Sequence, residues 1–239
     1  MRHEEVEQII KGAIAESRFN LLEHEAKNVC IQFGIPVPGF ALAKTADEAV
    51  EHANRLGYPI VLKIISPDIV HKTEAGGVLV GLQDSENIRT GFSRIMDNAK
   101  RYRVDARIVG MLVQKMAPQA TEVIIGGIKD PQFGQTVMFG LGGIFVEIMK
   151  DVTFRVAPIT RADAMQMIHE IKAYPILKGY RNQPPADEEA IAQTLLNVSN
   201  LAMEFPEISE IDLNPTMVYP KGASVVDARI ILGKEKSEK

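Results

Sequence analysis

A lysine, a histidine and a pair of glycines lie close together in one part of the sequence. Lys63 interrupts the apolar run at 60–65, His71 follows in a polar stretch, and Gly76 and Gly77 end that stretch. An imidazole titrates near neutral pH, so an uncharged ring that can act as a nucleophile is available. A nearby ammonium group and a glycine-bounded loop suit phosphate chemistry. The ordinary alternatives are a salt-bridged Lys63, a solvated His71 and a simple glycine turn.

Three oxygen-donor side chains near the C-terminal end of the sequence could bind a metal ion. Asp212 and Asn214 alternate with apolar residues, so a strand would project both from one face. Asp227 ends another apolar, strand-like run shortly afterwards. Carboxylate and amide oxygens are hard ligands that suit Mg²⁺, which also binds nucleotide phosphates. The alternative is a turn, because Asn214-Pro215 is a turn-forming pair.

Two polar segments in the middle of the chain could contact a nucleotide. Gln114, Lys115 and Met116 end a predicted strand ahead of Pro118, and such a strand end can present backbone groups to a flat base. Glu122 could hydrogen-bond a ribose. From these residues alone, a strand edge with surface polar side chains is the preferred interpretation.

A glycine cluster and an arginine form the last candidate. Gly142 and Gly143 close the glycine-rich stretch 140–143, which could admit a phosphate or a neighbouring backbone. Arg155 lies in the apolar run 152–157, and a guanidinium in such a place often binds a phosphate or a carboxylate. Glu147 is an equally good structural partner for it. The common nucleotide-binding patterns GxxxxGK[ST] and GxGxxG are absent from the sequence.

Local patterns predict a scaffold of alternating helices and strands for these candidates. Amphipathic helices are expected at 3–17 and 21–33, and Thr45-x-x-Glu48 is a capping box that opens a helix ending at Gly57. The remaining expected elements are strands at 40–43, 60–65, 78–82, 109–116, 122–129, 135–139, 152–157, 211–213, 216–219 and 224–230, and helices at 85–102, 160–171 and 187–205. This order is typical of an α/β (α+β) protein.

The composition is that of an ordinary globular protein. The 239 residues are 46% hydrophobic and 24% charged, with a net charge of −4 that argues against bulk nucleic-acid binding. Cys30 is the only cysteine, which excludes an internal disulfide and fits a reducing compartment; its expected place is an apolar helical face. No signal-like segment follows Met1, and no apolar run reaches the ~18 residues of a membrane span. A cytoplasmic protein without membrane or nucleic-acid partners is expected.

Taken together, the motifs resemble a known family. The series is Val61-Leu62-Lys63, Ala75-Gly76-Gly77-Val78, Val113-Gln114-Lys115-Met116, Glu122-Val123-Ile124-Ile125-Gly126, Gly140-Leu141-Gly142-Gly143, Ile211-Asp212-Leu213-Asn214-Pro215 and Val225-Val226-Asp227-Ala228-Arg229. In this order they resemble the ATP-grasp fold over residues 10–232, and within it the β subunit of ADP-forming acyl-CoA (acetate–CoA) synthetases, relatives of succinyl-CoA synthetase. The order of the motifs carries the resemblance more than any single one.

The resemblance implies a domain organisation. An N-terminal helical segment would occupy 1–34, the small lobe of the ATP-grasp fold 35–111 with the His71 loop, and the large lobe 112–232. A charged tail would follow at 233–239. In this family the nucleotide is held between the two lobes.

The resemblance also implies a reaction. Such an acid–thiol ligase converts an acyl-CoA, ADP and phosphate into the free acid, CoA and ATP, reversibly, through phosphohistidine transfer to Mg-ADP. The cofactors would be ATP or ADP and Mg²⁺. CoA would be bound by a partner α subunit that carries the first phosphohistidine, in an α2β2 assembly.

The family's residue roles carry over position by position. His71 would carry the phosphoryl group, and Asp212, Asn214 and Asp227 would lie at the metal. The nucleotide would be bound by Lys63, Gln114, Lys115, Met116, Glu122 and Arg155, and the phosphate loops would contain Gly76, Gly77, Gly142 and Gly143. The loop sequence His71-Lys72-Thr73-Glu74 departs from the Gly-Arg-Gly-Lys of succinyl-CoA synthetase and favours the acetate–CoA type.

Two other functions stay open at this point. One is an ATP-grasp ligase that joins a carboxylate to an amine and needs no histidine. The other is a non-catalytic subunit that senses nucleotides. The acyl group, the physiological direction, a preference for ADP over GDP and the size of the His71 loop motion are not set by the sequence.

Overall fold

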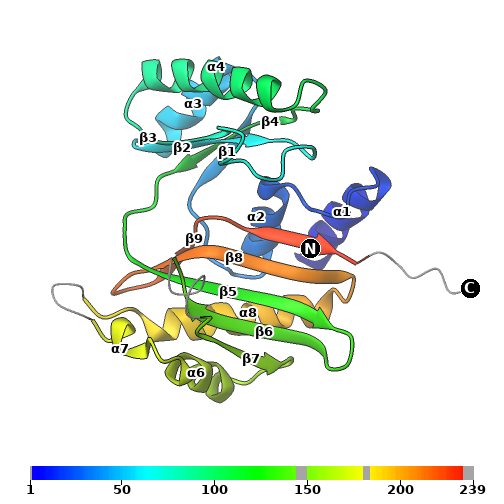
Figure 1. Cartoon of the computed structure of the whole chain (residues 1–239), viewed down its shortest axis with the longest axis vertical. Helices are drawn as coiled ribbons and strands as arrows, with labels where there is room; N and C mark the ends of the chain where they lie inside the picture. Colours follow the sequence, from blue (N-terminus) through cyan, green and yellow to red (C-terminus); the bar gives the residue numbers. More distant parts are fainter. Residues whose placement is uncertain (1, 144–149, 180–183, 234–239) are drawn as a thin grey trace, which may run out of the picture. The chain divides into compact units, whose positions relative to one another are not determined.

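The chain divides into two compact units in a computed structural model that describes residues 2–143, 150–179 and 184–233 (Figure 1). The small unit comprises Leu22–His24 and Pro38–Pro118, and the large unit comprises Met1–Leu21, Glu25–Val37 and Gln119–Lys239. Sequence reasoning expected a lobe boundary between 111 and 112 and a separate N-terminal segment. The division differs because the strand at 110–115 pairs within the small unit's sheet, while most of the N-terminal segment packs with the large unit.

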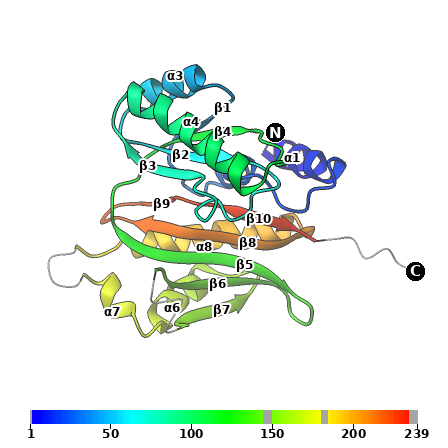
Figure 2. The same ribbon diagram turned by 45° about the horizontal axis from the view of Figure 1, so that its top comes forward.

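The small unit is one antiparallel sheet with two helices on one face (Figure 2). The strand order is β1-β4-β2-β3. The elements in chain order are β1 (Phe40–Ala43), α3 (Ala46–Leu56), β2 (Ile60–Ile65), β3 (Val78–Leu82), α4 (Ser85–Tyr102) and β4 (Gly110–Lys115). The His71 loop is the connection between β2 and β3.

Alternation along β2 separates a core face from a second face. Ile60, Leu62 and Ile64 are fully buried in the cluster formed with α3 and α4. Each such side chain contributes roughly 1.5–3 kcal/mol through removal from water. Lys63 therefore lies on the opposite face of the sheet, where it pairs in register with Leu112. Thr45 caps α3 by accepting a hydrogen bond from the backbone N–H of Glu48.

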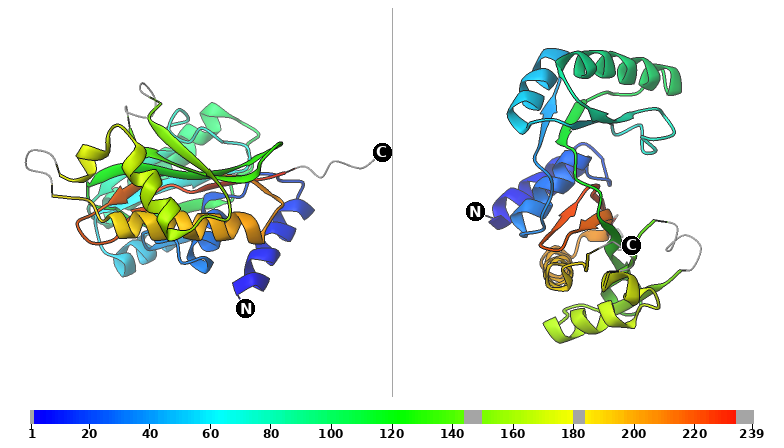
Figure 3. Two further views of the ribbon diagram at one scale, coloured as in Figure 1. Left: turned by 90° about the horizontal axis from the view of Figure 1, so that it is seen from below. Right: turned by 90° about the vertical axis from the view of Figure 1, so that its left-hand side faces the viewer.

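The large unit contains a six-stranded antiparallel sheet with the path β10-β8-β5-β6-β7, and β9 pairs with β8. Helices α6 and α8 lie along one face of it (Figure 3). The elements are α1 (Arg2–Ala15), α2 (Glu23–Gln32), β5 (Thr121–Asp130), β6 (Gly134–Leu141), β7 (Val152–Val156), α6 (Arg161–Glu170), α7 (Tyr174–Leu177), α8 (Glu188–Glu204), β8 (Ile208–Val218), β9 (Ala223–Val225) and β10 (Arg229–Leu232). The first two residues of α2 fall in the small unit.

The large unit's core fills the helix-covered face of its sheet. Val123 and Ile125 of β5 are fully buried there, as are Val137 and Phe139 of β6. Cys30 of α2 joins the same cluster, and burial raises the pKa of its thiol to about 12. The expectation of a small core cysteine is therefore met. The opposite, open face of the sheet is where the remaining polar candidates lie.

The observed elements differ from the sequence-based expectation in three places. The strands expected at 211–213 and 216–219 are one continuous strand, β8, and the strand expected at 224–230 is split into β9 and β10. The short helix α7 was not expected. The apolar stretch 144–149, with Glu147, and the tail after Gly233 lie outside the described residues. In the part of the chain that is described, no helix has the length and apolar character to cross a membrane.

Candidate functional site

The His71 loop is anchored on both sides of an exposed tip. Ile69 and Ala75 are buried in the small unit's core, at 2% and 5% exposure. Asn98 donates a hydrogen bond to the Gly76 carbonyl at 3.0 Å. The His71 side chain is 69% exposed, and its Nδ1 lies 3.9 Å from a carboxylate oxygen of Glu74, which is equally exposed. The ring is therefore presented at the surface of the small unit.

The glycine pair is required by packing. Gly76 has a φ of +60°, and a Cβ there would lie 2.7 Å from the Asn98 amide nitrogen. A Cβ on Gly77 would meet Ile64 at 2.5 Å. The N–H of Gly77 donates to the Lys72 carbonyl at 2.7 Å and closes the loop. These contacts account for both glycines as a tight turn, the ordinary alternative considered for them, and the phosphate role expected of this loop stays a prediction.

Lys63 is one member of a charge cluster that the sequence did not reveal. Its Nζ donates to Oε1 of Glu23 at 2.6 Å, and Lys72 binds the other oxygen of the same carboxylate. Glu23 and Lys63 are each 5% exposed. Lys63 is therefore salt-bridged, as one of the two interpretations of its sequence context allowed. Glu23 could not be found from local sequence because its partners are 40 and 49 residues away.

The segment 114–116 is only partly suited to the nucleotide contacts expected of it. Lys115 donates its ammonium to the carbonyls of Gly57 and Tyr58, at 2.9 and 2.5 Å. The N–H of Met116 is used by the Pro59 carbonyl at 3.0 Å. Gln114 differs: it is fully buried, and both polar atoms of its side-chain amide lack a hydrogen-bond partner. A buried amide in this state needs a hydrogen-bond partner, such as a ligand or an ordered water.

Glu122, Gly142 and Gly143 meet at one corner of the large unit's sheet. The N–H of Gly142 donates to the Glu122 carbonyl at 2.8 Å. A Cβ on Gly142 would lie 3.1 Å from the Glu122 carbonyl carbon, and Gly143 has a φ of +63°. Glycine at 142 thus allows the two strands to approach, and the Glu122 side chain remains exposed.

Asp212 and Asn214 lie on the open face of β8. Leu213 between them is fully buried in the core on the helix-covered face. The register shows that Ile124 of β5 lies opposite both Asn214 and Pro215, because its neighbours pair with Leu213 and Thr216. This is a β-bulge, a place where a sheet tolerates proline. The Asn-Pro pair therefore bends a strand where the sequence suggested a turn.

Asp227 is brought to this bulge by the backbone. It lies in the connection between β9 and β10, and not at the end of a strand as expected. The N–H of Val226 donates to the Pro215 carbonyl at 2.9 Å. This hydrogen bond joins the neighbour of Asn214 to the neighbour of Asp227, so the two residues are held near each other.

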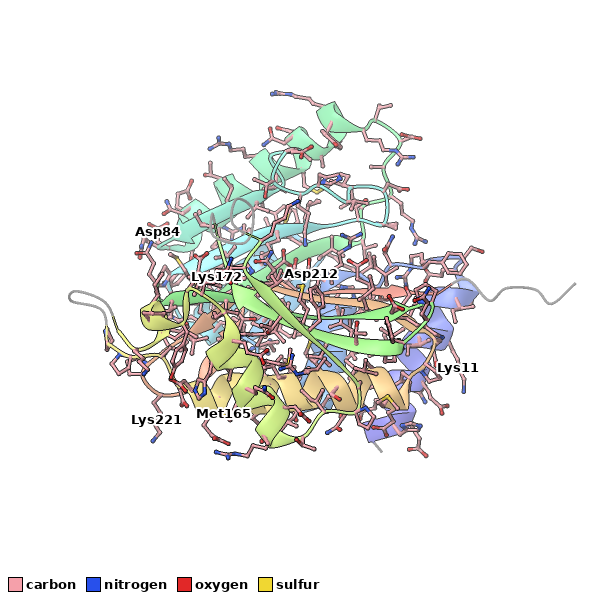
Figure 4. All side chains as sticks on the ribbon, turned by 60° about the horizontal axis from the view of Figure 1, so that its bottom comes forward. Lys11, Asp84, Met165, Lys172, Asp212 and Lys221 are labelled. Carbon is pink, nitrogen blue, oxygen red and sulfur yellow. The ribbon has the colours of Figure 1, made fainter. Side chains whose placement is uncertain are left out.

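The electrostatics around Asp212, which is labelled in Figure 4, suit a cation. Its Oδ1 is buried and has no hydrogen-bond partner. Burial raises the pKa of the Asp212 carboxyl, the charges of Glu210 and Asp227 raise it further, and Arg229 opposes them. Two carboxylates and an amide are a donor set that fits Mg²⁺. Among the described residues no group of three or more His, Cys, Asp or Glu side chains has metal-binding geometry; this set relies on Asn214 as its third donor.

Arg155 is not brought to the open face. On β7 it shares a face with Thr153, whose hydroxyl donates to the Met167 carbonyl of α6 at 3.2 Å. Its guanidinium binds both carboxylate oxygens of Glu170 at 2.7 Å. Arg155 thus lies on the helix-covered face, opposite to Asp212, with a carboxylate partner 15 residues away. The ion pair gives Arg155 a structural partner, and its expected phosphate role stays a prediction.

Comparison with known proteins identifies the family. The model of the ATP-grasp domain matches residues 12–232. The chain is 53% identical over 225 residues to the β subunit of ADP-forming acetate–CoA ligase I of Pyrococcus furiosus, covering 94% of this chain and 97% of the relative. The chain belongs to the ATP-grasp β subunits of the ADP-forming acetate–CoA ligases.

Two further members place the chain within this family. It is 45% identical over 235 residues to acetate–CoA ligase (ADP-forming) I of Archaeoglobus fulgidus, covering 98% of this chain but 34% of that longer protein. A structure of Candidatus Korarchaeum cryptofilum dinucleotide forming acetyl-coenzyme A synthetase 1, in complex with coenzyme A, Ca-AMPCP and HgCl+, superposes with a TM-score of 0.93 at 50% identity. It covers 95% of this chain and 99% of its own chain. The ATP-grasp fold expected from the motifs is thereby confirmed.

Proposed function

We propose that the chain binds ADP with Mg²⁺ and transfers a phosphoryl group to it from His71, within an ADP-forming acyl-CoA synthetase. The observation that carries the proposal is the exposed imidazole of His71 on a loop that is anchored on both sides. Family membership supplies the overall reaction, in which an acyl-CoA, ADP and phosphate yield the acid, CoA and ATP.

The small unit supplies the phosphoryl carrier and one amide. His71 accepts the phosphoryl group on a ring nitrogen that carries no proton. In the forward step the N–P bond breaks and its electron pair stays on the ring, while an oxygen of the ADP β-phosphate forms the new P–O bond. Gln114, with its buried and unpartnered amide, is suited to hydrogen-bond the nucleotide. The ammonium of Lys63 would be shared between Glu23 and a phosphate.

The large unit supplies the acidic residues. Asp212, Asn214 and Asp227 would hold Mg²⁺, and the buried, unpartnered Oδ1 of Asp212 supports this role. When bound, the ion neutralises phosphate charge, which is the main requirement of phosphoryl transfer. Glu122 is exposed beside Gly143 and would orient the nucleotide by hydrogen bonding.

The chain works with a partner that binds CoA. This part of the proposal is supported by the longer Archaeoglobus fulgidus relative, in which the matched region is 34% of one polypeptide. The remainder of such a protein can supply the acyl and CoA chemistry. An assembly of two α and two β subunits is the arrangement we propose.

The proposal is tested by labelling with γ-³²P-ATP and Mg²⁺ in the presence of the CoA-binding partner. Wild type should acquire acid-labile, alkali-stable label, and His71→Ala should lose the label and essentially all acyl-CoA synthesis while ADP affinity is unchanged. His52→Ala, in the same unit, is the matched control and should keep both. Undiminished turnover in His71→Ala contradicts the proposal and favours a carboxylate–amine ligase; nucleotide binding with no labelled histidine in any mixture favours a sensing subunit.

A further inference from the structure

Helix α2 contains a lysine whose side chain is completely buried. Lys27 is 0% exposed and lies beside Ala26 and Val29 in the core of the large unit. Moving an ammonium group out of water is costly unless it gains hydrogen bonds or opposite charges. Lysine is also among the residues least often found fully buried. Its position therefore calls for a specific role.

The ammonium of Lys27 binds the chain that leads into Asp227. Its Nζ donates to the Val226 carbonyl at 2.8 Å and lies 3.4 Å from the Val225 carbonyl. Those residues are 199 and 198 positions away in sequence. Val225 ends β9, so the contact falls where the chain leaves the sheet. One helix side chain thus holds two consecutive peptide groups.

The N–H groups of the same two residues are also bound. Val225 donates to the Pro36 carbonyl at 2.8 Å, and Val226 donates to the Pro215 carbonyl at 2.9 Å. The peptide groups before Asp227 are therefore held on both sides, and one of the four hydrogen bonds ties them to the bulge at Asn214-Pro215. Such a clamp fixes the backbone from which Asp227 projects.

We propose that Lys27 is a positioning residue that sets Asp227 against Asn214 for Mg²⁺ binding, an inference that rests on the proposed function of these two residues. Lys27 acts through the Val225 and Val226 carbonyls and does not need to touch the nucleotide. Groups that orient metal ligands typically contribute 10–100-fold to metal affinity. The effect should therefore appear in the metal-dependent part of nucleotide binding.

The chemistry of lysine fits this role better than that of its replacements. An ammonium is compact and has three donors, so it can serve two adjacent carbonyls at once. Methionine would fill a similar volume but leave both carbonyls without this donor. Glutamine would keep one amide donor. The series Lys27→Gln and Lys27→Met therefore removes the donors in two steps.

The experiment measures ADP affinity of the full chain by calorimetry, with Mg²⁺ and with EDTA at matched ionic strength. In wild type, Mg²⁺ should tighten ADP binding. In Lys27→Met this gain should fall by roughly tenfold or more, in the range of outer-shell substitutions, while the affinity for metal-free ADP stays unchanged. Lys27→Gln should fall between the two, and it serves as the test variant if Lys27→Met does not fold.

Two controls separate positioning from general destabilisation and from failure of the metal site. Val29→Ala removes a fully buried side chain from the same helix and should destabilise the protein without changing the Mg²⁺ gain. Asp227→Asn should lose the gain itself. If Asp227→Asn loses the Mg²⁺-dependent gain in ADP affinity and both Lys27 variants keep this gain, the inference on Lys27 is overturned. If Asp227→Asn also keeps the gain, the proposed metal site fails instead.

Discussion

The buried charged side chains of the two units make contacts of different kinds. Among the described residues, the buried charged side chains are Glu23 and Lys63 in the small unit, and Lys27 and Asp151 in the large unit. In the small unit charge meets charge, since Glu23 binds Lys63 and also Lys72 of the His71 loop. In the large unit, Lys27 donates hydrogen bonds to backbone carbonyls, and Asp151 accepts hydrogen bonds from the N–H groups of residues 172 and 173.

This difference has a mechanical consequence. A carboxylate that serves two lysines keeps a partner when one of them leaves, so Lys72 can move with the loop while Lys63 stays neutralised. A charge on backbone groups has no such exchange, since releasing it leaves a buried peptide group unsatisfied. We therefore expect the Lys72 contact to break at a lower cost in free energy than the contacts of Lys27 with the Val225 and Val226 carbonyls.

The largest expected effect is on the shared carboxylate. Glu23→Gln removes the carboxylate charge that binds both lysines, including the buried Lys63. Breaking a buried ion pair in this way costs about 3–5 kcal/mol. Lys72→Met, at a side chain that is 21% exposed, should cost only about 1 kcal/mol and should increase hydrogen exchange in the loop. Urea unfolding of both variants measures the comparison.

Equal losses in the free energy of unfolding of these two variants would contradict the expected difference between the two lysine contacts of Glu23. A loss below about 1 kcal/mol in Glu23→Gln would show that Lys63 finds another partner as readily, and that charge pairing does not organise this unit.

A smaller, pH-dependent effect tests the large unit. Asp187 accepts hydrogen bonds from the N–H groups of Gly222 and Ala190, so it caps α8 and holds the turn after β8. These bonds, first that from Gly222, lower the pKa of the Asp187 carboxyl. A lowered folded-state pKa gives stability that is present above the ordinary Asp pKa and is lost as pH falls through the folded value.

Asp187→Ala should therefore cost about 1 kcal/mol at pH 7, the usual cost of losing an N-cap. The difference between wild type and variant should shrink as the pH falls below about 4, where the carboxylate is protonated. Thermal unfolding at several pH values measures it. A difference that is constant with pH would mean that the carboxylate charge does not hold these N–H groups.

What the sequence predicted well was local. Thr45 caps α3, as the predicted capping box requires, because the cap needs only residues three positions apart. Strand β2 was predicted within its observed bounds from one apolar run. The order of short motifs then carried the family, and with it the ATP-grasp fold.

What the sequence could not predict depends on contacts between distant segments. Glu23 gave no local signal, and the continuity of β8 through Asn214-Pro215 depends on a bulge set by pairing with β5. Lys27 gave no local signal either, because it stands between Ala26 and Asn28 in a largely polar part of α2, and its carbonyl partners lie almost a chain length away. The sequence alone therefore does not show which distant residues pair with these side chains.

Substitution of Arg155 has the smallest expected effect on stability. It also tests directly on which face of the large unit's sheet this side chain lies. Its bidentate pair with Glu170 is partly exposed, at 27% and 38% for the two side chains, and such pairs contribute at most about 1 kcal/mol. Because the pair lies on the helix-covered face of the sheet, Arg155→Ala should leave ADP affinity unchanged in Mg²⁺. A double-mutant cycle with Glu170→Ala measures the pair, and calorimetry measures the nucleotide. A manyfold loss of ADP affinity in Arg155→Ala alone would overturn the face assignment and support the phosphate role that its apolar strand suggested.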